Sequence, residues 1–176
     1  MLTSVLIAIG VLVGIFLIFI ARQSSAMKIS RELLVKAKPE TIFPYINNSK
    51  KTDEWMPWRD SDPGAKMNYS GPEEGVGSMS KWDSPGKMGA GQAVIVESTP
   101  QRVVKTQLTY TRPMQMSQLA EISLTPQDGG TLVRWSVTGK NNFVGRIFCF
   151  FMNMDKMVGG EFEKGLAKLK ALVEVK

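Results

Sequence analysis

The sequence predicts an α+β fold in which a seven-stranded antiparallel sheet wraps around a long C-terminal helix, preceded by one N-terminal transmembrane helix. Three observations predict this fold: an uncharged apolar start, seven short segments with strand patterning, and a final segment with apolar residues at helical spacing. The chain has 176 residues, which suits one domain with an appendage better than two domains.

The composition narrows the classes of function. With 43% hydrophobic and 22% charged residues, the chain is neither disordered nor collagen-like. The absence of histidine excludes His-based catalytic triads and His-ligated metals, and the single cysteine, Cys149, excludes an intrachain disulfide. We therefore expect no metal site and no cofactor. The net charge of +6 comes from scattered basic residues, a pattern that does not indicate nucleic-acid binding.

Residues 2–21 predict a membrane-spanning helix. No ionisable side chain precedes Arg22, and twenty residues at a rise of 1.5 Å reach about 30 Å, the thickness of a bilayer core. A cleaved signal peptide is the alternative, since residues 24–26 form a small-residue site. No basic residue precedes the apolar run, however, and the run is long for the apolar core of a signal peptide. We interpret residues 1–27 as an uncleaved anchor with a short linker, and residues 28–176 as a ligand-binding domain.

Charges beside this segment predict its orientation. Arg22, Lys28 and Arg31 follow the apolar run, and positive charge tends to stay in the cytoplasm, so the domain is expected on the cytoplasmic side of a single-pass protein. Three charges are few, and the periplasmic or extracellular side stays open. Gly10 and Gly14 form a G-x-x-x-G pair that would suit a weak homodimer, although glycines are also common in membrane helices without this role.

The domain is expected to begin with one strand and two short helical segments. Residues 28–36 favour a strand that ends before Pro39. Pro39 suits the first turn of a helix, which we expect to end near Asn47. A second short helix or turn follows at residues 52–55, and Pro57 is expected to end it.

Six further strands follow, and their charged residues set which side chains point outward. We expect these strands at residues 66–70, 78–83, 92–98, 102–110, 118–125 and 131–139. The alternation predicts that the following side chains point inward: Met67, Tyr69, Trp82, Val104, Thr106, Leu108, Tyr110, Ile122, Leu124, Val133, Trp135 and Val137. Glu97 has an ambiguous phase. Tight turns between consecutive strands predict an antiparallel meander rather than a parallel sheet.

The chain is expected to end in an amphipathic helix at residues 155–173, with Asn153 as its N-cap. This helix would cover the apolar face of the sheet. Gly159, Gly160 and Gly165 lower its helix propensity, which predicts either close approach to another backbone or mobility of its first half.

Residues 143–154 connect the last strand to this helix. They are apolar but too few to span a bilayer. One interpretation is a buried connection, and the other is a lid over a cavity mouth that dips toward the membrane. Because few residues separate the anchor from the first strand, we expect the domain to lie close to the lipid surface.

This order of elements is that of the helix-grip fold, and the residues also carry a resemblance. The segment from residue 27 to the C-terminus resembles the START-like (SRPBCC) superfamily, which includes bacterial polyketide cyclase/dehydrase-related and lipid-transport proteins, and within it a membrane-anchored bacterial branch. The residues that carry the resemblance are Trp55-x-x-Trp58, Trp82, Pro100-x-Arg102-Val103, Val133-x-Trp135, and residues 70–77, 89–91, 97–98, 151–157 and 162–166.

The resemblance implies a deep apolar cavity between the curved sheet and the C-terminal helix. The large strand residues that are expected to point inward would line such a cavity from the sheet side. Met154, Met157 and Phe162 would line it from the helix side. The alternative is that these side chains simply fill the core. We predict the ligand-binding residues to be Tyr69, Trp82, Tyr110, Trp135, Met154 and Phe162.

The predicted function is that of a membrane-anchored protein that holds a lipid or other hydrophobic small molecule in this cavity. The alternative is an enzyme of the polyketide cyclase/dehydratase type, or a hydrolase, in which a Tyr or Glu acts as acid or base on a hydrophobic substrate. A structural anchor domain with a filled core is a third hypothesis. The absence of histidine and the shortage of inward charges favour binding. Carboxylates in expected loops, such as Asp60 and Asp62, are interpreted as solvated.

Overall fold

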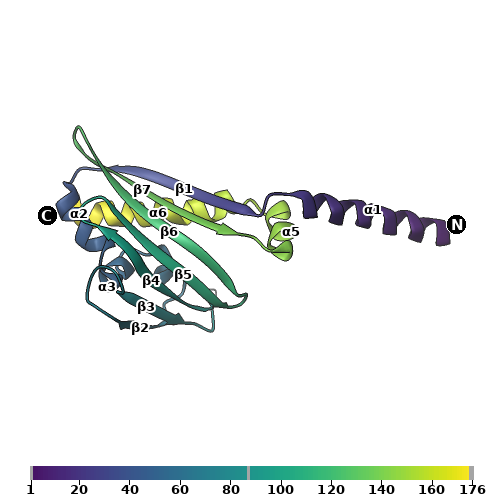
Figure 1. The fold of residues 1–176 in the computed structure, drawn as a ribbon, viewed down its shortest axis with the longest axis horizontal. Coiled ribbons are helices and arrows are strands. Elements are labelled where there is room, and N and C mark those ends of the chain that lie inside the picture. Colours follow the sequence, from purple (N-terminus) through teal and green to yellow (C-terminus); the bar gives the residue numbers. More distant parts are fainter. Residues whose placement is uncertain (1, 87, 175–176) are drawn as a thin grey trace.

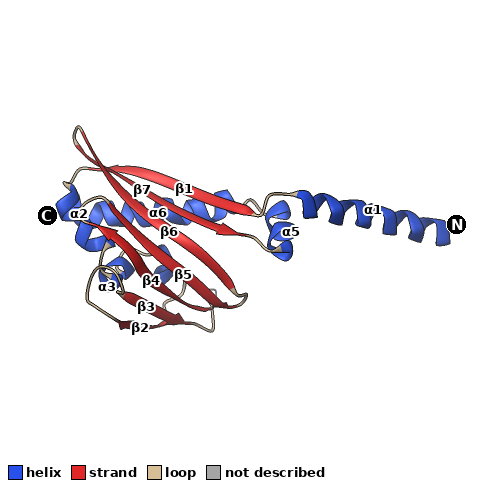
Figure 2. Ribbon diagram, in the orientation of Figure 1, coloured by secondary structure: helices blue, strands red, loops and turns tan. Residues whose placement is uncertain are grey.

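The computed structural model describes residues 2–86 and 88–174. Helix α1 (Leu2–Arg22) projects from a domain in which one face of a single sheet packs against helix α6 (Met154–Glu174) (Figures 1 and 2). In the described part of the chain, α1 is the one helix that is long and apolar enough to cross a membrane. The structure therefore has the predicted α+β architecture with a terminal apolar helix.

The sheet has seven antiparallel strands in the order β1-β7-β6-β5-β4-β3-β2. Strands β2 to β7 form the predicted meander, and β1 pairs with β7 at its edge. Every predicted strand is present with ends within two residues of the expected ones. Their bounds are β1 Ala26–Val35, β2 Lys66–Ser70, β3 Met79–Asp83, β4 Ala90–Thr99, β5 Val103–Arg112, β6 Met116–Gln127 and β7 Gly130–Lys140.

The strand register confirms which side chains share a face. Residues directly opposite each other on paired strands point to the same side of a sheet. Trp82 lies opposite Gly91, which in turn lies opposite Tyr110, and the other predicted inward residues follow the same alternation. Glu97 is on the outer face, where its carboxylate binds Lys105 Nζ at 2.8 Å. We call the side of the sheet that faces α6 the inner face.

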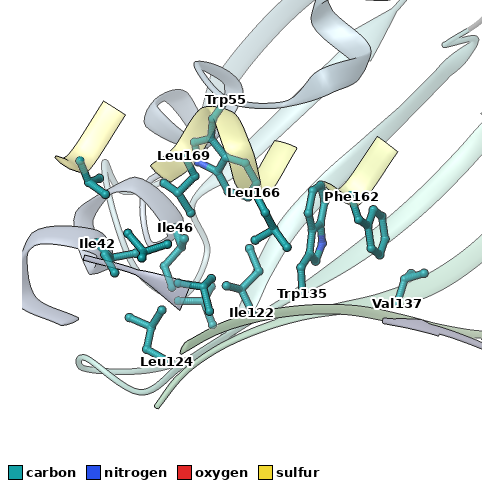
Figure 3. Close-up of a cluster of buried hydrophobic side chains, with 14 of the residues drawn as sticks. Ile42, Ile46, Trp55, Ile122, Leu124, Trp135, Val137, Phe162, Leu166 and Leu169 are labelled. Atoms are coloured by element: carbon teal, nitrogen blue, oxygen red, sulfur yellow. The ribbon is translucent and has the colours of Figure 1, made fainter. Parts of the chain in front are cut away.

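The hydrophobic core fills the space between α6 and the inner face of β1, β7 and β6 (Figure 3). Trp135 of β7 and Phe162 of α6 stack with ring centroids 4.1 Å apart and ring planes 9° from parallel. Trp55 and Trp58 meet the Trp135 ring edge-on at 5.2 and 5.8 Å. Four packed aromatic rings thus fill the space between β7 and α6.

Three short helices connect β1 to β2: α2 (Pro39–Ile46), α3 (Ser49–Asp53) and α4 (Pro57–Ser61). The expectation that Pro57 only ends a helix was wrong, because Pro57 begins α4. Proline is favoured at this position since the first turn of a helix does not use its N–H group. Helix α3 is capped by Asn48, whose side chain accepts hydrogen bonds from the backbone of Lys50 and Lys51.

A short helix, α5 (Phe143–Phe151), occupies the connection between β7 and α6. The interpretation as a buried connection was wrong, since 52% of Phe150 and 72% of Phe151 are exposed. The expectation for α6 is confirmed: it begins at Met154, and Asn153 Oδ1 accepts a hydrogen bond from the backbone N–H of Lys156 at 2.9 Å.

Candidate ligand-binding site

The six residues predicted to bind a ligand do not form one cluster. Two of them, Trp135 and Phe162, are only 3% and 2% exposed. One face of each ring is covered by the other, and Trp58 packs edge-on against both. These two side chains are therefore part of the core rather than the wall of an open cavity. The Trp55-x-x-Trp58 spacing was recognised in the sequence, but its role in filling this space was not.

Trp82 and Tyr110 form the second group, on the inner face of the half of the sheet that is farther from β1. Their rings meet edge-on at 5.5 Å, and both side chains are half-buried. Trp82 lies over Gly91, where an added Cβ would come within 2.5 Å of the indole ring. Burial raises the pKa of Tyr110, so at neutral pH its hydroxyl is protonated and available as a hydrogen-bond donor.

Tyr69, on edge strand β2, is held away from that pair. Its hydroxyl donates a hydrogen bond to Asp53 Oδ2 at 2.8 Å, and Asp53 also binds Arg59 Nε at 3.0 Å. Burial and the Asp53 carboxylate both raise the pKa of Tyr69. The side chain therefore joins the edge strand to α3 and remains neutral over the physiological pH range.

Met154 lies in a different place, at an open hollow of about 630 Å³ where the start of β1, the end of α5 and the start of α6 meet. We call this space the junction hollow. Met157, one turn further along α6, is 47% exposed and does not line it. The lining residues are Ser24, Ala26, Met27, Lys28, Ile29, Asn141, Cys149, Phe150, Phe151, Met152, Asn153, Met154 and Asp155.

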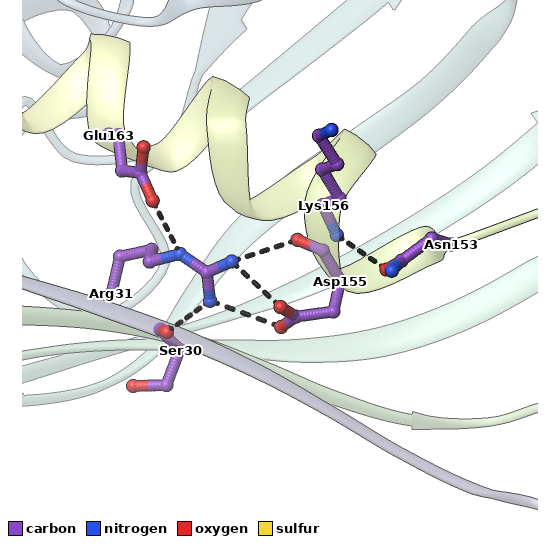
Figure 4. Close-up of polar contacts among 6 residues, drawn as sticks. All are labelled: Ser30, Arg31, Asn153, Asp155, Lys156 and Glu163. Atoms are coloured by element: carbon purple, nitrogen blue, oxygen red, sulfur yellow. Dashed lines mark hydrogen bonds and ion pairs between the residues drawn. The ribbon is translucent and has the colours of Figure 1, made fainter.

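One wall of the junction hollow is fixed by an ion-pair cluster (Figure 4). The guanidinium of Arg31 donates to both carboxylate oxygens of Asp155, at 3.1 and 2.8 Å, and to Glu163 at 2.7 Å. These bonds lower the pKa of Asp155, which keeps it ionised at neutral pH. An added Cβ at Gly159 would lie 2.1 Å from Arg31 Nη2, so glycine makes room for this contact. The close approach expected of the α6 glycines therefore involves a side chain rather than a backbone.

In the sequence, Arg31 was assigned only to the charges that flank the anchor, and this role was not predicted. Arg31 lies opposite Trp135 in the sheet. Its side chain points to the same face of β1 as those of Ile29 and Leu33. A single charge on the apolar face of a strand was therefore the signal, because such a charge needs a partner from the covering element.

A second hollow, of about 460 Å³, lies over β2, β3 and β4. Its polar lining side chains include Lys66, Asn68, Lys81, Asp83 and Gln92, which alternate with the inward-facing residues and so belong to the outer face. Met67, Gly91 and the predicted ligand-binding residue Trp82 also line this hollow. It lies over the edge of the sheet at β2 and β3, away from α6, and so is not the predicted cavity between the sheet and the helix.

Comparisons with known proteins agree with this architecture. Residues 26–174 match the family model for polyketide cyclase / dehydrase and lipid transport proteins. A comparison with curated proteins found no match. Among solved structures, the Aha1 dimer from Colwellia psychrerythraea superposes with a TM-score of 0.61 at 19% identity, covering 85% of this chain and 97% of that one.

Two further solved structures share the fold. A protein of unknown function from Staphylococcus aureus has a TM-score of 0.61 at 13% identity, covering 87% of this chain and 96% of that one. The di-domain ARO/CYC StfQ from the steffimycin biosynthetic pathway has a TM-score of 0.60 at 12% identity, covering 85% of this chain and 51% of that one. With the family match over most of its length, this chain belongs to the polyketide cyclase/dehydrase and lipid transport family, an SRPBCC-type family with the helix-grip fold.

Proposed function

We propose that the protein is a membrane-anchored binding protein that holds a lipid or another amphipathic hydrophobic molecule in the junction hollow. The observation that carries the proposal is the hollow itself. Its volume of about 630 Å³ falls within the range of about 300–1,000 Å³ that is usual for small-molecule pockets. Apolar Met and Phe side chains line it together with polar groups, a mixture that suits a molecule with an acyl part and a polar head.

Two of the residues that line the hollow belong to the inner face of the sheet. Met27 and Ile29 line the hollow, and they point to the same face of β1 as Arg31, which is the inner face. Farther along that face, Trp82 and Tyr110 are half-buried rather than packed in the core. We propose that the apolar part of the ligand extends toward these two rings, where the neutral Tyr110 hydroxyl can donate a hydrogen bond.

We propose further that α1 crosses the membrane as an uncleaved anchor, with the domain in the cytoplasm. The side chains of α1 are almost all exposed, as expected for a helix surrounded by lipid, and Arg22 and Arg146 both lie at its C-terminal end. Open space surrounds Gly10 and Gly14, so a homodimer through these residues stays a prediction.

The charges at the site favour binding over catalysis. A general acid works best with a pKa near the working pH, and burial moves the pKa of Tyr110 upward, away from it. Asp155, the carboxylate that lines the hollow, is a weak base because Arg31 lowers its pKa. Both pKa shifts move these groups away from the range near neutral pH that favours acid–base catalysis.

The proposal predicts that the full chain, extracted from membranes in mild detergent, carries bound lipid or fatty acid in native mass spectrometry. Met154→Gln should reduce this occupancy, because the variant loses about 1 kcal/mol of apolar contact with the ligand, equivalent to about a fivefold weaker affinity.

Met157→Gln is the matched control, since Met157 is on the same helix but outside the hollow. Lipid that merely surrounds α1 would remain in both variants. Absence of any bound molecule from the wild type, or equal loss from both variants, would contradict the proposal.

A further inference from the structure

Helix α5 presents an apolar stripe that the rest of the domain does not cover. Phe143, Val144, Phe150 and Phe151 are all exposed, Val144 by 59%. Positions seven residues apart lie on the same side of a helix. Val144 and Phe151 therefore lie on one side of α5, and Phe143 and Phe150 lie directly beside them. Exposed apolar surface of this kind marks an interaction site.

This stripe is continuous with the C-terminal end of α1. The ring of Phe150 meets the rings of Phe16 and Phe19 edge-on, at 5.4 and 6.0 Å, and Phe151 lies 5.9 Å from Phe16. Arg146 donates two hydrogen bonds from Nη1 to the backbone carbonyls of Ala21 and Gln23, at 2.8 and 3.0 Å. These contacts hold α5 at a fixed level beside α1, as Figure 1 also shows.

The sequence of α1 indicates the depth of α5 in the bilayer. Arg22 is its first charged residue and marks the polar boundary. Phe16 and Phe19 precede it by six and three residues, so at 1.5 Å per residue they lie about 9 and 5 Å inside that boundary. The rings of α5 that contact them lie at the same depth. Amphipathic helices at membrane interfaces bury their apolar face to about 5–10 Å.

We infer that α5 lies in the headgroup–acyl boundary of the leaflet in which α1 ends, so that the junction hollow opens directly onto that leaflet. Phe150 and Phe151 belong both to the lipid-facing stripe and to the wall of the hollow. A ligand could then pass between lipid and hollow without crossing water. Basic Lys140 and Lys156 flank the helix, α5 itself carries no acidic residue, and the carboxylate of nearby Asp155 is paired with Arg31, a charge distribution that suits an anionic lipid surface. The inference rests on the proposed membrane position of α1.

Site-directed spin labelling tests this inference on the full chain in vesicles of phosphatidylcholine and phosphatidylglycerol. Cys149→Ser provides a cysteine-free background, in which single cysteines are placed at Phe151, Val144, Val11 and Asp128 in separate variants. Molecular oxygen concentrates in lipid and a nickel chelate in water. We expect labels at positions 151, 144 and 11 to collide more often with oxygen, and the label at position 128, in the β6–β7 hairpin, to collide more often with nickel.

The four positions separate the two claims. If position 11 behaves as lipid-embedded while positions 144 and 151 behave as water-exposed, the inference about α5 is wrong and the anchor stands. If position 11 is itself water-exposed, the proposed membrane anchor fails. If positions 144 and 151 are shielded from both reagents, the stripe is covered by protein, such as a second copy of the chain, and the inference is overturned as well.

Discussion

At the scale of single residues, Trp82 is positioned by a chain of hydrogen bonds that begins at Asp62. The indole Nε1 of Trp82 donates to the Met88 carbonyl at 3.1 Å, and the Met88 N–H donates to Asp62 Oδ2 at 3.0 Å. Ser84 Oγ donates to the same carboxylate oxygen at 2.7 Å. The expectation that Asp62 is solvated was wrong, since the residue is buried. Its donors come from the β3–β4 turn, 22 and 26 residues further along the chain, and local sequence does not reveal that contact.

Asp62→Ala is expected to lower the melting temperature by about 4 °C at pH 7, because it leaves the buried Ser84 hydroxyl and the partly buried Met88 N–H without their acceptor. The bonds from Met88 and Ser84 hold the pKa of Asp62 below its ordinary value. Its contribution to stability is therefore present above about pH 4 and is lost as the pH falls through the lowered pKa.

Thermal unfolding of the wild type and of Asp62→Ala from pH 7 to pH 3 measures this effect. The difference between their melting temperatures should shrink as the pH approaches 3. Asp60→Ala is the control, since the exposed pair between Asp60 and Lys168 should contribute little. A difference that stays constant with pH, or an equal loss in the control, would refute the role given to Asp62.

At the scale of elements, the packing of α6 explains two of its three glycines. Gly159 accommodates Arg31, and Gly165 faces Trp135, where an added Cβ would lie 2.8 Å from the ring and 3.1 Å from Pro57. Around Gly160 an added Cβ would meet nothing within 4 Å. The sequence predicted either close approach or mobility for these glycines, and it could not tell which glycine has a neighbour, because that depends on segments far away in the chain.

The packing predicts opposite signs for two otherwise identical substitutions. Gly165→Ala should destabilise the domain by about 1–3 kcal/mol, because it overpacks the contact with Trp135. Gly160→Ala should stabilise it by up to about 1 kcal/mol, because alanine favours the helix and meets no obstacle. Chemical unfolding of the detergent-solubilised chain, followed by tryptophan fluorescence, measures both. Stabilisation of similar size in the two variants would show that α6 is not held against β7 as described.

At the scale of the whole molecule, the sequence predicted the architecture and the inner face but not the location of the hollow. Strand phase depends on neighbouring residues, so the alternation of Lys81 and Trp82 was enough to orient β3. The junction hollow forms where residues 24–29 meet residues 149–155, and that meeting depends on how α5 turns toward α1. For the same reason, Met154 lines the hollow while Trp135 and Phe162 are in the core.

The central claim is that the junction hollow holds a lipid-like molecule, and photocrosslinking with a diazirine-labelled fatty acid or phospholipid tests it most directly. The labelled lipid is added to membranes that contain the full chain, and peptide mass spectrometry locates the crosslinks. The account predicts crosslinks in residues 24–29 and 149–155, reduced by excess unlabelled lipid. Crosslinks confined to α1, or to the outer face over β2 and β3, would contradict it.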